Sequence, residues 1–308
     1  MTRILRSIVA RLALALLAPA TLAHAADDGK VAVVASFSIL ADLVRNVGGD
    51  GVRVTALVGP DADAHIYSPS PADARSLAAA DLVVVNGLGF EGWIDRLVAA
   101  SGYRGPIVVA SAGVSPLQET ATGPDGKQHT ALDPHAWQNL ANARIYVDNI
   151  ARGLAAADPR RAANHAARAR RYAASIEQLD ASVRREFGAI PRAQRRVITS
   201  HDAFAYFGSA YDVEFIHLVG VSTESETSAR DIAALTERIR RDRISAMFLE
   251  NISSPRLLEQ VAKESGARIG GTLYSDALSG PDGPASTYLD MFRHNVGQLV
   301  RALRGPER

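Results

Sequence analysis

The stretch RRVITSHDAFAYF, from Arg195 to Phe207, changes character at its middle. Its first half is rich in β-branched residues, which predicts a short strand, and the segment from Asp202 onward predicts the start of a helix. His201 therefore lies where a strand ends and a helix begins. Because ligands bind at this junction in open parallel α/β sheets, His201 is a candidate general base, metal ligand or helix cap.

The same alternation of strand and helix continues on both sides of this stretch. The strand candidates are residues 31–35, 52–58, 82–85, 107–110, 197–199, 213–216, 246–249 and 268–271. Amphipathic segments predict helices at residues 38–47, 72–80, 93–100, 142–157, 203–210, 229–242, 255–265 and 286–303. Buried strands separated by helices indicate parallel sheets covered on both faces, so we predict an α/β fold.

One further predicted helix is much longer than the others. Asp158 is a helix-capping residue followed by proline at the first helical position, and no glycine or proline then occurs up to Phe187. At a rise of 1.5 Å per residue this helix is about 45 Å long. We therefore predict two lobes, each a parallel sheet flanked by helices, joined by one long connecting helix. The predicted boundaries are 26–157, 158–190 for the connecting helix, and 191–308.

The amino terminus predicts export from the cytoplasm. Three arginines, an apolar run to about Leu17 and the small residues before Asp27 indicate a signal peptide over residues 1–25. Without it, 31 of the 34 basic residues remain against 33 acidic ones, a formal charge of −2, which argues against a nucleic-acid partner. No other apolar run approaches the roughly 20 residues of a membrane span, and the chain has no cysteine. We expect a soluble periplasmic protein without disulfides or a lipid anchor.

Four side chains near predicted strand ends or stiff turns are candidates for a binding site: His65, His135, His201 and Asp276. His65 follows a strand and a Gly-Pro turn, His135 follows a proline, and Asp276 follows the last predicted strand. Each has a structural alternative, because a histidine at a helix start can be a cap and aspartate is common in turns. Together they could converge in one crevice.

These residues lie in segments that resemble the bacterial solute-binding protein 9 family, the periplasmic zinc- and manganese-binding components of ATP-binding-cassette importers. The similar segments follow the family's order along the chain: Ser36–Leu40, His65–Tyr67, Ala80–Gly87 with Glu91 and Trp93, Leu132–Trp137, Thr199–Phe204, Gly220–Glu226, Phe248–Glu250 and Leu273–Asp276. They extend over almost all of the predicted mature chain.

The resemblance implies one metal site between the lobes, with His65 and His135 from the first lobe and His201 and Asp276 from the second. Three imidazoles and one carboxylate suit four-coordinate Zn²⁺. Because imidazole nitrogen favours zinc and carboxylates suit manganese, we expect zinc as the transported metal, with Mn²⁺ or Fe²⁺ as the alternative. Binding is expected to weaken below about pH 6, as the imidazoles take up protons.

Some positions depart from the family pattern. Ala64 and Ser68 replace a proline and a glutamate that are common beside the first histidine, so we expect His65 to be held less rigidly. Only His129 represents the histidine-rich loop of many zinc-binding members, and it is a candidate for transient metal contact. We interpret three other histidines as helix-surface or packing residues: His165, His217 and His294. Acidic candidates for contacts to the ligand imidazoles are Asp133, Asp202, Glu226 and Glu250.

The resemblance also implies transport and no enzymatic activity. The expected partner is the membrane permease of an ATP-binding-cassette importer, with a metallochaperone as a further candidate, and the protein is expected to be a monomer. A periplasmic zinc hydrolase is one alternative, but four protein ligands leave no open position for water, and the sequence contains no His-Glu-x-x-His or Gly-x-Ser-x-Gly motif. A surface adhesin is another alternative, for which the sequence offers no lipid-bearing cysteine.

Overall fold

The computed structural model describes residues 29–122, 128–224, 228–242, 244 and 246–305. The predicted signal peptide, residues 1–25, lies outside this range. Within the range, no helix combines the length and the apolar character needed to cross a bilayer. The chain from Val31 onward forms one compact unit by its internal contacts. The predicted lobe boundaries within that unit therefore stay a prediction.

The first sheet has four parallel strands in the order β2-β1-β3-β4. Its strands are β1 (Val31–Phe37), β2 (Val52–Val58), β3 (Leu82–Val85) and β4 (Ile107–Val109). The helices that connect them are α1 (Ser38–Gly48), α2 (Pro71–Ala78) and α3 (Ile94–Ser101). The central strands β1 and β3 are almost wholly buried, as their continuous apolar sequences predict.

The second sheet has four parallel strands in the order β10-β9-β7-β8. Its strands are β7 (Arg196–His201), β8 (Glu214–Val219), β9 (Ala246–Glu250) and β10 (Arg268–Leu273). Its helices are α6 (Ala205–Tyr211), α7 (Ala229–Asp242), α8 (Arg256–Ser265) and α9 (Tyr288–Arg304). The strand-to-helix reading of the stretch around His201 is confirmed, since β7 ends at that residue and α6 follows.

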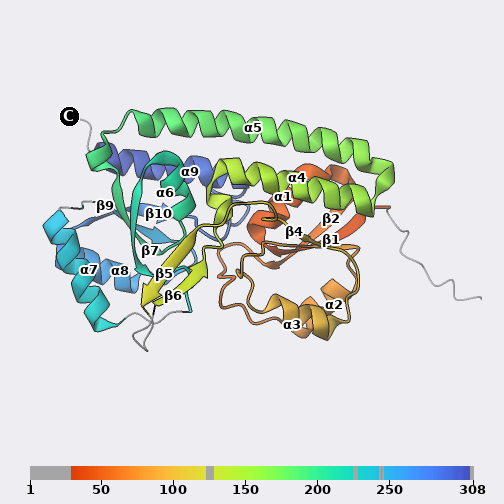
Figure 1. Cartoon of the computed structure of the whole chain (residues 1–308), viewed down its shortest axis with the longest axis horizontal. Helices are drawn as coiled ribbons and strands as arrows, with labels where there is room; N and C mark the ends of the chain where they lie inside the picture. The colour runs from red at the N-terminus through yellow and green to blue at the C-terminus, as the bar shows by residue number, and fades with distance from the viewer. Residues whose placement is uncertain (1–28, 123–127, 225–227, 243, 245, 306–308) are drawn as a thin grey trace, which may run out of the picture. The chain divides into compact units, whose positions relative to one another are not determined.

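Helix α5 (Ala162–Gly188) has 27 residues and lies between the two sheets in the sequence. The Asp158 side chain accepts a hydrogen bond from the Arg160 backbone N–H at 3.1 Å, so the predicted cap is present, although the first turn, Pro159–Arg161, is a 3₁₀ helix. α5 packs against α1 and α4 (Leu140–Ala157) before it and against α6 and α9 after it (Figure 1). The predicted α/β class with a long connecting helix is confirmed. We call the chain before α5 the first half and the chain after α5 the second half.

An antiparallel hairpin lies between β4 and α4, where no strand was predicted from the sequence. Strands β5 (Gln118–Thr122) and β6 (Gln128–Leu132) pair with each other and with neither parallel sheet. Both are dominated by polar residues and alanine, so they lack the apolar pattern that identified the other strands. The hairpin leads directly into the segment that contains His135.

The two halves meet in a shared core near the carboxyl ends of the strands. The Trp137 indole of the first half donates to the Ser275 carbonyl of the second at 3.0 Å, and the Leu278 backbone N–H donates to Ser38 Oγ at 3.0 Å. The main cluster of buried apolar side chains runs continuously from β1 to α9. This contact region carries the candidate metal ligands.

Candidate metal centre

The four side chains singled out in the sequence lie together in the region where the halves meet. His65 belongs to the loop between β2 and α2, His135 to the segment after β6, His201 to the end of β7, and Asp276 to the loop after β10. One ligand atom from each lies within 4.8 Å of those of the other three. His65 is 7% exposed, and the others are 1% exposed or less. Segments more than 200 residues apart in the chain thus bring four metal-binding groups to one buried point.

The distances between these groups suit a small cation. Nε2 of His65 lies 3.3 Å from Nε2 of His135 and 3.2 Å from Oδ2 of Asp276. Nε2 of His201 lies 3.1 Å from that same oxygen, and Nε2 of His135 lies 3.6 Å from Oδ1. Ligands bound tetrahedrally at about 2.0 to 2.2 Å are roughly 3.3 to 3.6 Å apart. The arrangement is therefore close to that of a tetrahedral metal centre.

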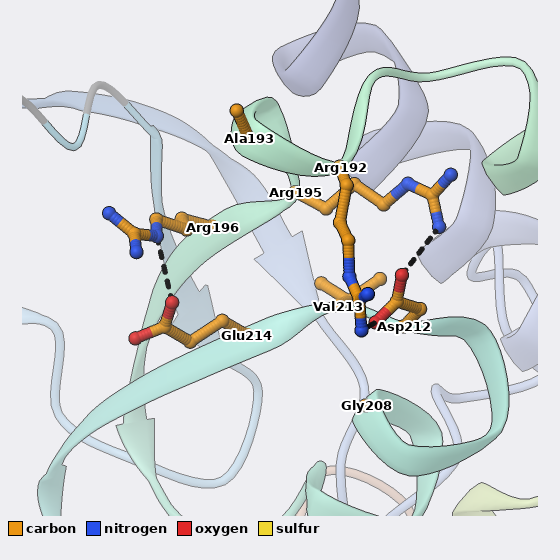
Figure 2. Close-up of a pocket in the computed structure, with 8 residues that line it drawn as sticks. All are labelled: Arg192, Ala193, Arg195, Arg196, Gly208, Asp212, Val213 and Glu214. Atoms are coloured by element: carbon orange, nitrogen blue, oxygen red, sulfur yellow. Dashed lines mark hydrogen bonds and ion pairs between the residues drawn. The ribbon is translucent and has the colours of Figure 1, made fainter.

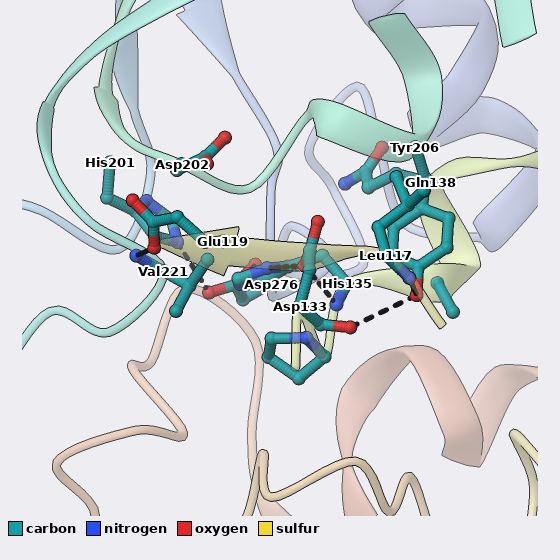
Figure 3. Close-up of polar contacts among 12 residues, drawn as sticks. Leu117, Glu119, Asp133, His135, Gln138, His201, Asp202, Tyr206, Val221 and Asp276 are labelled. Atoms are coloured by element: carbon teal, nitrogen blue, oxygen red, sulfur yellow. Dashed lines mark hydrogen bonds and ion pairs between the residues drawn. The ribbon is translucent and has the colours of Figure 1, made fainter. Parts of the chain in front are cut away.

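Two carboxylates, Asp133 and Glu250, lie against the imidazoles of His135 and His201. Figure 3 shows the first of them, Asp133, beside His135. Asp133 Oδ1 lies 2.8 Å from Nδ1 of His135 and also accepts its backbone N–H. Glu250 Oε2 lies 2.6 Å from Nδ1 of His201, and Oε1 accepts the backbone N–H groups of Ser200 and His201. A proton on each Nδ1 leaves each Nε2 free to bind a cation. Both carboxylates were among the sequence candidates for this role.

His65 is held mainly through its backbone and its ring faces. Its backbone N–H donates to Asp63 Oδ1 at 2.8 Å, a contact the sequence analysis did not identify. Phe90 packs edge-on against the imidazole, with ring centroids 4.7 Å apart, and the indole of Trp137 packs against His135 at 5.3 Å. Tyr67 packs edge-on against Trp93, with ring centroids 5.2 Å apart, and donates its hydroxyl to Asp73.

The charges of the site favour protonated imidazoles when no cation is bound. Burial by itself lowers the pKa of His135, but Asp276 and Asp133 raise it overall to about 9. For His201, burial again opposes the shift, and Glu250 and Asp276 hold the pKa well above its usual value. Burial alone would raise the pKa of Asp276, yet the two imidazoles hold it well below its usual range. A metal that binds here must displace protons.

A second group of polar side chains lies beside the first. Glu119 of β5, Asp202 and His217 of β8 each offer one atom within 4.8 Å of the others. His217 Nδ1 lies 3.5 Å from Asp202, and Nε2 lies 3.7 Å from Glu119. Burial lowers the pKa of His217, but the bond to Asp202 and the two negative charges raise it overall. Asp202, a sequence candidate for contact with His201, is thus engaged with His217, which is a strand residue and not on a helix.

The remaining sequence candidates lie elsewhere. His165 is buried within α5, and His294 of α9 contacts the Thr272 carbonyl through Nε2 at 3.0 Å, so both are packing residues as expected. Glu226 and the side chain of His129 lie outside the described part of the structure.

Figure 2 shows a surface pocket at the amino end of β7, on the opposite edge of the sheet from His201. Its charged side chains already pair with one another. Arg192 and Arg195 contact Asp212 at 2.6 and 3.3 Å, and Arg196 contacts Glu214 at 2.8 Å. Among the residues that line it, the pocket therefore offers no unpaired charge to a ligand.

The chain is similar to several proteins whose names describe metal binding or metal uptake. Residues 33–302 match a family described as "Zinc-uptake complex component A periplasmic". The chain is 33% identical to the iron-binding protein YfeA of Yersinia pestis, over 88% of this chain and 86% of that one. It is 34% identical to the manganese-binding lipoprotein MntA of Bacillus subtilis, over 90% and 91%.

Two similar solved structures carry different metals in their names. The periplasmic zinc-binding protein TroA of Treponema pallidum has a TM-score of 0.81 and 30% identity, with 89% of this chain and 99% of that one covered. A manganese-bound periplasmic metal-binding protein of Candidatus Liberibacter asiaticus has a TM-score of 0.78 and 32% identity, with 89% and 100% covered. The relatives thus agree on metal binding and differ on the metal.

Proposed function

The chain belongs to the family of the periplasmic component A of zinc-uptake complexes, and from this premise we propose that it captures Zn²⁺ for delivery to an ATP-binding-cassette importer. At the level of the family it is a metal-binding substrate-binding protein and not an enzyme. Proteins of this class work with a membrane permease and its ATPase. The choice of zinc and the ligand set are our proposal.

The observation that carries the proposal is the convergence of three imidazole nitrogens and one carboxylate on a buried point. We propose that His65, His135, His201 and Asp276 are the four ligands of one ion. Zinc accepts four ligands of this type tetrahedrally, whereas manganese prefers more oxygen atoms and a higher coordination number. The buried position supports retention of the ion during diffusion to the membrane.

The second candidate is the same role for manganese or iron. It is favoured by the names of two relatives, the manganese-binding MntA and the iron-binding YfeA, both about one-third identical to this chain. Asp276 could contribute both oxygens to such an ion, because its Oδ1 lies 3.6 Å from His135 and its Oδ2 3.1 Å from His201. Zinc and manganese therefore need a direct comparison.

We further propose that the protein acts as a monomer in the periplasm, with residues 26–157 and 191–308 as lobes on either side of the 158–190 connector. Packing of α5 against both halves supports small rearrangements on metal binding and not a wide hinge motion. Several relatives are named lipoproteins, whereas this sequence has no cysteine, so free diffusion is part of the proposal. A metallochaperone that loads the site is a further proposed partner.

A competitive titration of purified metal-free protein with zinc and manganese tests the proposal. We expect one equivalent of zinc to bind, manganese to compete poorly, and His201→Ala to lower the zinc affinity by 100-fold or more, on the order of 3 kcal/mol for a lost ligand. His294→Ala is the matched control, because that histidine lies in α9 and packs on Tyr274. Preferential manganese binding would favour the second candidate, and an unaffected His201→Ala would remove that residue from the site.

A further inference from the structure

The segment Gly220–Glu224, here called the strap, follows β8 and lies beside the metal centre. It borders two pockets. One is lined by His65, Val221, Ser222 and Glu224, and the other by His201, Asp63 and Thr223. The four candidate ligands are 7% exposed or less, and each of these two pockets has one of them, His65 or His201, in its wall. Residues of the strap line both pockets.

The strap belongs to the second half of the chain but is held by carboxylates of the first half. The Thr223 hydroxyl donates to Asp63 Oδ2 at 2.7 Å, and the Val221 backbone N–H donates to Glu119 Oε2 at 3.2 Å. At its base, the Asp202 backbone N–H donates to the carbonyls of Val219 and Gly220. The strap is therefore fixed to its own half at one end and bonded across to the other half further along.

Asp63 has a second bond that links the strap to the metal centre. Its Oδ1 accepts the backbone N–H of His65 at 2.8 Å, while its Oδ2 accepts the Thr223 hydroxyl. One carboxylate thus orients the loop of a proposed ligand and anchors the strap that covers it. Asp63 is not one of the four converging groups.

We propose that the strap retains the bound ion, and that Asp63 is a positioning residue that couples strap closure to the placement of His65. This inference rests on the proposed function and adds the group that controls the exchange of the ion. When the Asp63–Thr223 bond breaks, the strap frees the pockets beside His65 and His201, and the ion exchanges faster. The bond joins the halves, so it forms only when they are correctly apposed.

Loss of the Asp63–Thr223 hydrogen bond should change the dissociation rate of the bound ion by a measurable factor. A hydrogen bond to a charged group contributes about 1.5 to 3 kcal/mol when buried. Both partners are half-buried, which places the effect near the lower limit, and that limit corresponds to about a tenfold change in rate. Because an open strap eases both entry and exit, the change in equilibrium affinity is smaller than the change in the dissociation rate.

The test compares Thr223→Val, which removes the hydroxyl but keeps the shape, with Thr223→Ser, which keeps the hydroxyl. The full chain is loaded with zinc alone and mixed with excess chelator, and the dissociation rate is followed by stopped flow. We expect Thr223→Val to release zinc about tenfold faster and Thr223→Ser to stay within about twofold of the wild type. The melting temperature of the metal-free protein should fall by only a few degrees in Thr223→Val and less in Thr223→Ser, which shows that both variants stay folded. Equal rates for Thr223→Val and wild type, or equal acceleration by both variants, would overturn the proposal.

Asp63→Ala extends the test to the positioning role. It removes both bonds of the carboxylate, so it should accelerate release at least as much as Thr223→Val and, in addition, lower the equilibrium affinity by about tenfold or more. An affinity equal to that of Thr223→Val would remove the link to His65. If the wild-type protein itself takes up no metal, the proposed function fails, which is distinct from intact binding with unaltered rates.

Discussion

At the scale of single residues, the metal centre depends on a few carboxylates that bind no metal themselves. Glu250 accepts the backbone N–H groups of Ser200 and His201 and lies against Nδ1 of His201. Asp133 accepts the backbone N–H of His135 and lies against Nδ1 of the same residue. Their negative charge fixes each imidazole tautomer and increases the basicity of each Nε2. The tautomer and basicity of the two imidazoles therefore depend on Asp133 and Glu250.

Glu250→Gln removes the negative charge of this side chain and keeps its size and shape. The amide oxygen can still accept the two backbone N–H groups, but the amide carries no charge to stabilise the ring of His201. We expect the metal affinity to fall by about 10- to 100-fold. The melting temperature of the metal-free protein should fall as well, because the charge of Glu250 stabilises the protonated His201. Glu259→Gln, at an exposed position of α8, is the control. Isothermal titration of both variants provides the comparison, and equal affinities would contradict the assigned role.

The raised pKa values of His135 and His201 give opposite pH trends for stability and for metal binding. A pKa that folding raises from about 6.5 to about 9 stabilises the metal-free protein fully below pH 6.5, and this stabilisation is lost as the pH rises through 9. The lowered pKa of Asp276 contributes above about pH 4 and is lost only in stronger acid. Between pH 6.5 and 9 the imidazoles therefore dominate.

Metal affinity should accordingly rise from pH 6.5 to 9, because each bound metal must displace the protons of the imidazoles. This window lies above the limit of about pH 6 that ordinary imidazoles would give. Melting curves with and without zinc at several pH values check both trends. A metal-free protein that gains stability between pH 7 and 9, or a zinc-induced shift that is constant over that range, would contradict the account.

At the scale of secondary-structure elements, the sequence best predicts those strands and helices whose residue pattern reflects burial. The four inner strands, β1, β3, β7 and β9, are mostly buried and, taken together, largely apolar, and α5 follows from an uninterrupted helical segment with its cap at Asp158. The hairpin β5–β6 was not predicted, because its pairing does not depend on an apolar face. The Asp63–Thr223 bond could not be foreseen either, since it joins loops 160 positions apart whose approach depends on the folded halves.

Helix α5 offers a direct test of how one element stabilises both halves. Ile176 lies near its middle and is fully buried in the main core. Ile176→Ala should lower the free energy of unfolding by about 2 to 4 kcal/mol, since it removes buried apolar volume that its neighbours cannot refill. Gln178→Ala, on the exposed face of the same helix, should change it by less than about 0.5 kcal/mol. Urea denaturation measures both, and a small effect of Ile176→Ala would show that α5 is weakly packed.

At the scale of the whole molecule, the two halves share one core and one metal centre. Of the site, the sequence predicted which residues converge only through resemblance to a family, because nothing in local patterns brings His65 near Asp276. The convergence arises where the carboxyl ends of two parallel sheets face each other. Metal binding and the apposition of the halves are therefore coupled.

This coupling predicts a single unfolding transition that metal shifts as a whole. The metal-free protein should unfold in one step, because the main core runs through both halves. Zinc at about 1,000 times its dissociation constant should stabilise it by about 4 kcal/mol without splitting the transition. Differential scanning calorimetry with and without zinc tests this, and two separate transitions would show that the halves unfold independently.

The most direct test of the central claim is a crystal structure of the zinc-loaded protein with anomalous data collected at the zinc absorption edge. The account predicts one strong anomalous peak, about 2.0 to 2.2 Å from Nε2 of His65, His135 and His201 and from an oxygen of Asp276. A peak that lies elsewhere, or that any one of these four side chains fails to contact, would contradict it.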